Sequence, residues 1–308
     1  SVCGIFFRID NEFTLAAVCS TFLDKPFLQS ILSHQTYQTE GIMKIDFQET
    51  TDDLAKRIDI HSRFGSRDID QWMLEILDLQ PGIKIFDVGC GSGKQCFSFF
   101  HHLQGNVQIT GTDVSESLLT DAREKNKAID DAVDFRFLDF NQRFDLPENH
   151  YDLISACFAI YYAQNIPFTL SEMHRLLVPG GRLFTTGPMP SNKQLFYDII
   201  KEATGKPIPP MPGSSRYASE IFGTMQALFS KTEQHIFENP LTFDSVEPFM
   251  VYTRASMSED RKLWNSLFQT HDEFENVMAA IEKTAQRYLE RDGKLVMTKV
   301  VGGFIATK

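Results

Sequence analysis

The sequence lacks three features that would direct it to a membrane, an oxidising compartment or a nucleic acid. It has no uninterrupted apolar run of about 18 residues, which is the length that a membrane-spanning helix needs. Its five cysteines include no CxxC pair, which argues against a disulfide framework and a zinc site and favours a reducing cytoplasm. Basic residues are too few for a broad phosphate-binding surface, since 30 Lys and Arg against 41 Asp and Glu give a net charge of −11. We therefore expect a cytoplasmic protein that acts on a small molecule, with no metal and no membrane or nucleic-acid partner.

The N-terminal part carries no targeting signal that we recognise. Charged residues interrupt the apolar patches of residues 1–23, so no signal-peptide core forms there. Met43-Lys44 opens a polar stretch of the kind that often begins a domain. We interpret residues 1–42 as an extension, within an N-terminal helical arm or extension that covers residues 1–60.

Residues 61–190 carry the pattern of a parallel α/β sheet. Short β-branched or aromatic runs alternate there with amphipathic helical stretches, which is the signature of βαβ units. Proline and glycine pairs end several of these segments. The expected strands span residues 84–88, 107–112, 133–138, 151–157 and 182–186, and the expected helices span 69–79, 115–127 and 168–177, with a further helix around residues 97–100.

The composition changes after residue 190. Four prolines between Gly205 and Gly213 predict a loop between two helices, inside a helical insertion that covers residues 191–230. Two further strands are expected at 231–237 and 294–306, within a C-terminal region of residues 231–308. Between them a mostly helical segment forms a cap over about 244–292. The predicted fold is a doubly wound, mostly parallel seven-stranded α/β sheet with a helical cap subdomain.

A glycine-rich turn follows the first predicted strand and leads into a helix. In the run Asp87-Val88-Gly89-Cys90-Gly91-Ser92-Gly93, glycine permits positive φ and close approach of a ligand, and the helix N-terminus offers free N–H groups. Asp113 ends the next strand about 20 residues later, where a carboxylate can accept both hydroxyls of a ribose. Nicotinamide dinucleotides and S-adenosyl compounds both use this arrangement. The nicotinamide fingerprint GxGxxG fails here, because Lys94 stands at its last position.

The run DVGCGSG resembles motif I of the class I S-adenosylmethionine-dependent methyltransferases, and the resemblance extends over residues 84–187. Thr112-Asp113-Val114-Ser115 is similar to the ribose-binding motif of that family, and Leu138-Asp139-Phe140 to its acidic adenine-binding motif. Residues 151–159 resemble the fourth-strand motif. Residues 175–183 resemble the family's RxLKPGGxL turn, with valine in place of the usual lysine.

This resemblance implies S-adenosylmethionine as the cofactor and S-adenosylhomocysteine as the product. Asp87 and the backbone of Gly89 and Gly91 would hold the methionine end, with Cys90 between the two glycines in the same turn. Asp113 would bind the ribose.

The resemblance also implies how the adenine is held. Asp139 would accept a hydrogen bond from the adenine amino group, while the N–H of Phe140 faces the ring. Val114 would pack on the adenine face and Ala156 would lie near the sulfonium. For Val114 and Ala156, packing in the protein core is an equal alternative.

The acceptor site is expected just beyond the strand ends, where ligands of open α/β sheets bind. Tyr161 and Tyr162 follow the fourth strand and are our first candidates to line it, by hydrogen bonding or as an aromatic wall, because a phenol with a pKa of about 10 is a poor base. His61 is a third candidate, from the segment before the first strand. The apolar residues of the cap either line an acceptor pocket, form the core of the cap, or provide a homodimer contact.

We therefore predict a methyltransferase that acts on O or N of a small-molecule acceptor. The segment Ser155-Ala156-Cys157-Phe158 lacks the Asn/Asp-Pro-Pro-Tyr/Phe run of base-amino methylation, and Cys157 lacks the preceding proline of cytosine-C5 chemistry. One alternative is a methyltransferase-like protein that binds the cofactor or a partner without catalysis. A less favoured alternative is a nicotinamide-dependent oxidoreductase.

Overall fold

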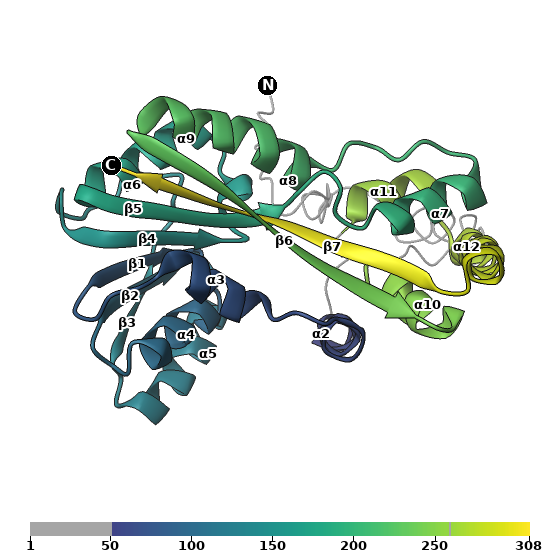
Figure 1. Ribbon diagram of the computed structural model, residues 1–308, viewed down its shortest axis with the longest axis horizontal. Coiled ribbons are helices and arrows are strands. Elements are labelled where there is room, and N and C mark those ends of the chain that lie inside the picture. The colour runs from purple at the N-terminus through teal and green to yellow at the C-terminus, as the bar shows by residue number, and fades with distance from the viewer. Residues whose placement is uncertain (1–50, 259) are drawn as a thin grey trace, which may run out of the picture. The chain divides into compact units, whose positions relative to one another are not determined.

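The computed structural model of the chain describes residues 51–258 and 260–308 (Figure 1). These residues belong to one compact unit. The expectation about residues 1–42, and most of the predicted arm, lies outside the described residues. Within the described part, no helix is long and apolar enough to cross a membrane.

Seven strands form one sheet in the order β3-β2-β1-β4-β5-β7-β6. Strands β1 to β5 pair in parallel, whereas β7 runs antiparallel to both of its neighbours. The predicted seven-stranded, mostly parallel sheet is confirmed. The strands are β1 (Lys84–Val88), β2 (Gln108–Asp113), β3 (Val133–Phe137), β4 (Tyr151–Cys157), β5 (Leu177–Pro188), β6 (Lys231–Phe243) and β7 (Leu295–Thr307).

Helices cover both faces of this sheet. On one face, Ile85 of β1 packs with residues of α3 (Ile69–Leu77), α4 (Lys94–His102) and α5 (Glu116–Asn126). On the other face, Phe86 shares a core with residues of α6 (Ile166–Leu176) and α9 (Phe222–Leu228), and Figure 1 shows these two layers on opposite sides of the strands. Because β1 is buried on both faces, its residues from Ile85 to Val88 are all buried and show no alternation, as expected for a central parallel strand.

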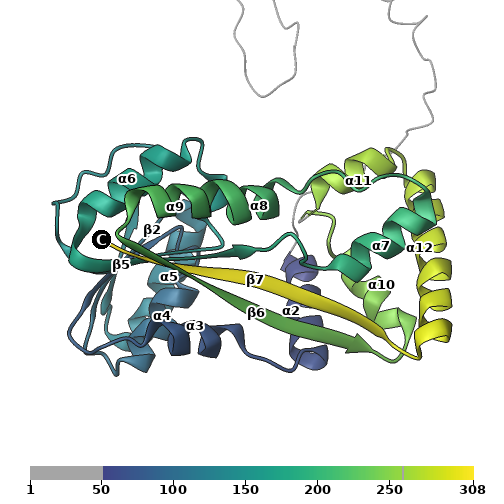
Figure 2. The ribbon, with the colours of Figure 1, turned by 45° about the horizontal axis from the view of Figure 1, so that its top comes forward.

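Strands β6 and β7 extend far beyond the other five (Figures 1 and 2). Their pairing runs without a break from Lys231 with Thr307 to Phe243 with Leu295. The sixth strand was expected to end at residue 237, and this expectation is wrong. Pro240 lies within the strand, and it is tolerated there because β6 is an edge strand.

The extended part of these two strands carries the helical cap. The cap contains α7 (Gln194–Thr204), α10 (Val246–Arg254), α11 (Arg261–Leu267) and α12 (His271–Asp292), and α2 (Thr51–Phe64) packs against α10 and β6. The predicted boundary at residue 60 therefore falls inside α2. The apolar cap residues, among them Phe249, Tyr252 and Trp264, form one buried core with Phe196 of α7. Of the three interpretations of the apolar cap residues, the structure supports the one in which they form the core of the cap.

Candidate functional site

The turn between β1 and α4 has the backbone that its sequence predicts. Gly89, Gly91 and Gly93 have φ values of 70°, 55° and 83°, a region that other residues rarely adopt. A Cβ atom at Gly89 would lie 2.5 Å from the Cβ of Ala159. The N–H of Cys90 donates to the carbonyl of Thr112 at 2.9 Å, so the turn is tied to β2.

Asp113 joins this turn to the end of β2. Its Oδ2 accepts a hydrogen bond from the N–H of Gly91 and its Oδ1 one from the N–H of Ser115, both at 2.9 Å. A carboxylate has about four acceptor positions, so two remain for a ligand. These two positions are suited to the paired hydroxyls of a ribose.

A cavity of about 140 Å³ lies against the turn and is lined by Asp87, Gly89, Cys90 and Phe158, among others. The side chain of Asp87 is 2% exposed and accepts hydrogen bonds from the Ser155 hydroxyl and the Cys96 thiol. Burial raises the pKa of Asp87 to about 6, because a charged carboxylate is poorly solvated there. A hydrogen bond with Cys90, together with burial, raises the pKa of the Cys96 thiol, and burial raises the pKa of the Cys157 thiol, so neither is an activated nucleophile.

Two buried oxygen atoms on the wall of the same cavity accept no hydrogen bond from the described residues. They are Oδ1 of Asp70, on α3, and Oε1 of Gln95, on α4. The other carboxylate oxygen of Asp70 pairs with the Lys94 ammonium at 2.8 Å. Buried polar atoms are nearly always satisfied, so these two acceptors call for a bound donor. Sequence reasoning missed both residues, because neither belongs to a motif.

The predicted adenine side lies at the end of β3. Oδ1 of Asp139 accepts hydrogen bonds from the backbone and side-chain N–H groups of Asn141, both at 2.9 Å, and the carbonyl of Phe140 accepts one from Thr169. Val114 is 52% exposed although it is apolar, as a residue that packs on a ligand would be. Ala156 lies on β4, and its side chain is fully buried in the core on one face of the sheet. For Ala156 the structure therefore shows core packing.

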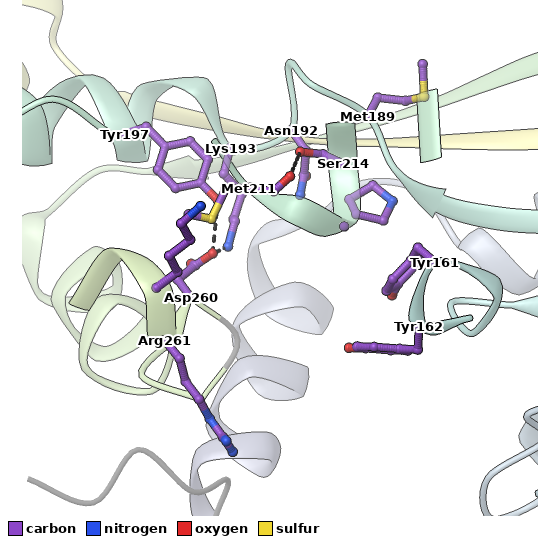
Figure 3. A pocket seen from close by; sticks show the side chains of 13 residues that line it. Tyr161, Tyr162, Met189, Asn192, Lys193, Tyr197, Met211, Ser214, Asp260 and Arg261 are labelled. Atoms are coloured by element: carbon purple, nitrogen blue, oxygen red, sulfur yellow. Dashed lines mark hydrogen bonds and ion pairs between the residues drawn. The ribbon is translucent and has the colours of Figure 1, made fainter. Parts of the chain in front are cut away.

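A second cavity, of about 320 Å³, lies next to the ends of β4 and β5. Tyr161 and Tyr162 form one wall, from the 3₁₀ turn η2 (Ile160–Tyr162), with their ring centroids 4.7 Å apart. Figure 3 shows Lys193, Tyr197 and Asp260 on the opposite side. The structure thus brings the two predicted tyrosines together, at a cavity.

The turn that carries the two tyrosines is held in place by Arg216. This residue begins η3 (Arg216–Ile221), a π-helical segment. Its guanidinium donates to the carbonyls of Tyr161 at 2.9 Å and Ala163 at 3.0 Å, and its Nε donates to Glu220 at 3.0 Å. Such π-helical segments are often found at functional sites.

A buried ion pair forms the far wall of this second cavity. The ammonium of Lys193 lies 2.7 Å from Oδ2 of Asp260, and the two side chains are 1% and 4% exposed. The hydroxyl of Tyr197 donates to Oδ1 of Asp260 at 3.0 Å. Sequence reasoning missed this group, because Lys193 and Asp260 are 67 residues apart in different helical regions.

His61 is not brought to either cavity. It lies on α2, with its ring centroid 6.1 Å from that of Tyr252 on α10. It is absent from the residues that line the two cavities described above. This geometry gives the predicted catalytic role of His61 no support. Among the described residues, no group of three or more His, Cys, Asp or Glu is placed to hold a metal ion.

Comparison with known families identifies the region that contains the glycine turn. Residues 86–183 match the model of a family described as a methyltransferase domain. These residues form a class I S-adenosylmethionine-dependent methyltransferase domain. The predicted family is thereby confirmed, and S-adenosylmethionine is its cofactor.

Curated relatives of the methyltransferase domain match it over part of their length. An uncharacterized protein of Haemophilus influenzae is 32% identical over 36% of this chain and 44% of its own. Phosphoethanolamine N-methyltransferase 3 of Arabidopsis thaliana is 29% identical over 40% of this chain and 24% of its own. The ubiquinone/menaquinone biosynthesis C-methyltransferase UbiE of Shewanella pealeana is 26% identical over 42% of this chain and 53% of its own. The matched part of this chain thus spans from a quarter to about half of these relatives.

The fold of this chain also agrees with that of a solved structure. The YcgJ protein of Bacillus subtilis superimposes with a TM-score of 0.51, over 78% of this chain and 97% of that protein. Their sequences are 12% identical, so this likeness concerns the fold alone.

Proposed function

We propose that this chain transfers the methyl group of S-adenosylmethionine to an oxygen or nitrogen atom of a small molecule bound in the second cavity. One observation carries the proposal: the end of β4 contributes to both cavities. Cys157 and Phe158 line the cavity at the glycine turn, and Tyr161 and Tyr162 line the other. A cofactor in the first cavity and an acceptor in the second would therefore meet at the carboxyl end of one strand, where ligands of such sheets bind.

The described residues of the first cavity fit the methionine end of the cofactor. The two unsatisfied acceptors of Asp70 and Gln95, together with the carboxylate of Asp87, would take the methionine ammonium. The ammonium of Lys94 and the N–H groups of the turn would face the methionine carboxylate.

The nucleoside half would lie along the ends of β2 and β3. The unused acceptor positions of Asp113 would bind the ribose hydroxyls. Asp139 would accept from the adenine amino group, the N–H of Phe140 would face the ring, and Val114 would cover one face of it.

When bound, the cofactor supplies a methyl group already activated by a positive sulfur. The protein's task is therefore to align the acceptor atom with the bond that breaks, and orientation of this kind can supply several kcal/mol of the barrier. Tyr161 and Tyr162 would orient the acceptor by contact with their rings and hydroxyls. Arg216 would keep them in place through the carbonyls of their turn.

We also propose that the predicted regions divide this work. Residues 61–190 would bind the cofactor. The insertion of residues 191–230 and the cap of residues 244–292 would supply the remaining walls of the acceptor cavity, since Lys193, Met211 and Asp260 line it.

Calorimetry and a labelled-methyl screen test the proposal together. We expect S-adenosylmethionine and S-adenosylhomocysteine to bind and NADH to show no heat. We then expect labelled S-adenosylmethionine to give labelled products with a pool of small metabolites. Cofactor binding without any product over broad pools would favour a non-catalytic binding protein, and binding of NADH alone would overturn the proposal.

A further inference from the structure

Phe158, the first residue after β4, is an aromatic residue that lies outside the protein core. It belongs to none of the three apolar cores that the described residues form. It is 40% exposed, and it lines the cavity at the glycine turn together with Asp87 and Gly89. Ligand cavities are lined mostly by apolar and aromatic side chains, so this position is typical of a residue that contacts a ligand.

The backbone of Phe158 departs from the alternation of the strand that precedes it. Side chains of a strand point to its two faces in turn. Ala156 is buried in the core on the α6 side of the sheet, and Cys157 packs against the core on the other side, at the cavity. Continued alternation would return residue 158 to the α6 side. Phe158 instead has a φ of 55° and lines the same cavity as Cys157.

This conformation is unusual for a bulky residue. The left-handed region favours glycine, and other residues adopt it at a cost that is met mostly at functional sites. Two contacts hold the segment in place. The N–H of Phe158 donates to the carbonyl of Thr186 on β5 at 2.9 Å, and Ala159 lies so close to the turn that a Cβ at Gly89 would be 2.5 Å from its own. The backbone that carries the ring is therefore fixed beside the glycine turn.

The chemistry of the cofactor gives a ring at this place a use. The sulfur of S-adenosylmethionine joins the methionine end to the nucleoside, so it would lie at the mouth of this cavity. That sulfur is positively charged before methyl transfer and is a neutral thioether afterwards. The face of an aromatic ring attracts a cation, whereas it offers a thioether only a weaker contact. A ring beside the sulfur can thus distinguish the methyl donor from its product.

From these observations we propose that the ring of Phe158 contacts the sulfonium and makes the site selective for the charged donor over the neutral product. An aliphatic side chain would fill much of the same space but would not make this distinction. The inference rests on the proposed function in one respect, because it requires the methionine end of the cofactor in this cavity. A site with this ring is less inhibited by its own product than a site without it.

Calorimetry on the full chain, without any acceptor, tests this inference. S-adenosylmethionine and S-adenosylhomocysteine are each titrated into the parent chain and into Phe158→Leu. The measured quantity is the ratio of the two association constants, donor over product. We expect this ratio to fall by about two- to thirtyfold in Phe158→Leu, which is the range for the loss of one cation–π contact. A general loss of stability would weaken both ligands alike and leave the ratio unchanged.

Three further variants separate the ring from its surroundings. Phe158→Tyr keeps an aromatic face and should keep the ratio. Phe168→Leu removes an exposed phenylalanine from α6, outside the cavity, and should leave the ratio unchanged. Phe158→Asn removes the ring with a side chain that tolerates the left-handed conformation, so it provides the same measurement if the leucine variant folds poorly.

Three results would overturn the inference. The first is an equal loss of affinity for both ligands in Phe158→Leu, since the ring would then only pack on the methionine chain. The second is a ratio that falls as far in Phe158→Tyr as in Phe158→Leu, and the third is a parent chain that binds neither ligand. Failure of the proposed methyl transfer looks different. In that case the ratio still shifts in Phe158→Leu, although no methylated product forms with any acceptor.

Discussion

The two cavities of this protein are built in different ways. The cavity proposed for the cofactor is lined by the end of β1 and the glycine turn that follows it, by residues of α3 and α4, and by the end of β4. The carboxylate of Asp113, at the end of β2, is tied to the same turn. The cavity proposed for the acceptor is lined by Tyr161, Lys193, Met211 and Asp260, which come from four separate parts of the chain. The first is thus centred on one local sequence motif, whereas the second depends on how distant elements pack.

This difference explains what each cavity depends on. The cofactor turn needs three glycines in a left-handed conformation, and its geometry follows from them. The acceptor cavity depends on long-range side-chain contacts, such as Arg216 to the tyrosine turn and Lys193 to Asp260. Substitutions should therefore affect cofactor affinity on one side and the stability of the cap on the other.

The largest effect is expected for Asp260→Ala. The substitution leaves the buried ammonium of Lys193 without its carboxylate partner, and breaking a buried pair on one side costs about 3–5 kcal/mol. Chemical denaturation should show this loss in the free energy of unfolding. Lys193→Met combined with Asp260→Leu should recover most of it. A single variant as stable as the parent chain would show that the pair does not hold the cap.

Asp113→Ala should have the largest effect on the cofactor side. It removes the acceptor of the ribose hydroxyls and of the Gly91 N–H, so the affinity for S-adenosylhomocysteine should fall by about 1.5–3 kcal/mol, or roughly ten- to 150-fold. Calorimetry measures the loss. Asp121→Ala, which removes an exposed carboxylate from α5, is the control. Unchanged affinity would mean that Asp113 is not the ribose ligand.

The pKa of Asp87 predicts a pH dependence of cofactor binding. Burial raises this pKa to about 6, and the proposed contact with the methionine ammonium needs the ionised form. Affinity should thus be constant above pH 7 and fall as the pH drops through 6, to about a tenth at pH 5. In Asp87→Asn the affinity should be weaker and independent of pH over this range. If the affinity of Asp87→Asn fell with pH as steeply as that of the parent protein, the titrating group would be a residue other than Asp87.

A smaller effect, with opposite signs on stability and binding, is expected for Gln95→Leu. The Oε1 of Gln95 is buried and unsatisfied, so its removal should raise the free energy of unfolding of the cofactor-free protein by about 1 kcal/mol. The affinity for S-adenosylhomocysteine should fall by a similar free energy. Denaturation and calorimetry on one protein preparation separate the two. A variant that loses stability and keeps its affinity would show that Gln95 has only a packing role.

The cofactor half of the molecule could be predicted closely from the sequence. The bounds of β1 and β4 agree residue for residue. The helix expected over residues 115–127 is α5, and the hydroxyl of Ser115 caps it by accepting from the N–H of Leu118. These features follow from local patterns, namely apolar runs, glycine turns and capping residues. The same patterns led to the family.

The other half could be predicted only in outline. The cap was expected to be helical, but the long-range contacts that hold it and the tyrosine turn were not expected. The contacts of Lys193 with Asp260 and of Arg216 with the tyrosine turn leave no periodic pattern in the sequence. The sixth strand was expected to end at residue 237 but continues through Pro240, which is tolerated because the order of the strands places β6 at an edge of the sheet. Asp70 and Gln95 have no motif, and only burial identifies them.

The continuous pairing of β6 with β7 ties the two halves of the site together. Residues 301–307 of β7 also pair with β5, whereas residues 295–300 pair with β6 alone and lie in the cap region. The cap and the sheet therefore share the same two strands. Neither region can be removed by cutting the chain at a loop, because the hydrogen-bonded pair of β6 and β7 runs through both. We therefore expect the cap and the sheet to unfold in a single thermal transition. Replacing the cap with that of a relative would also require replacing the extended parts of β6 and β7.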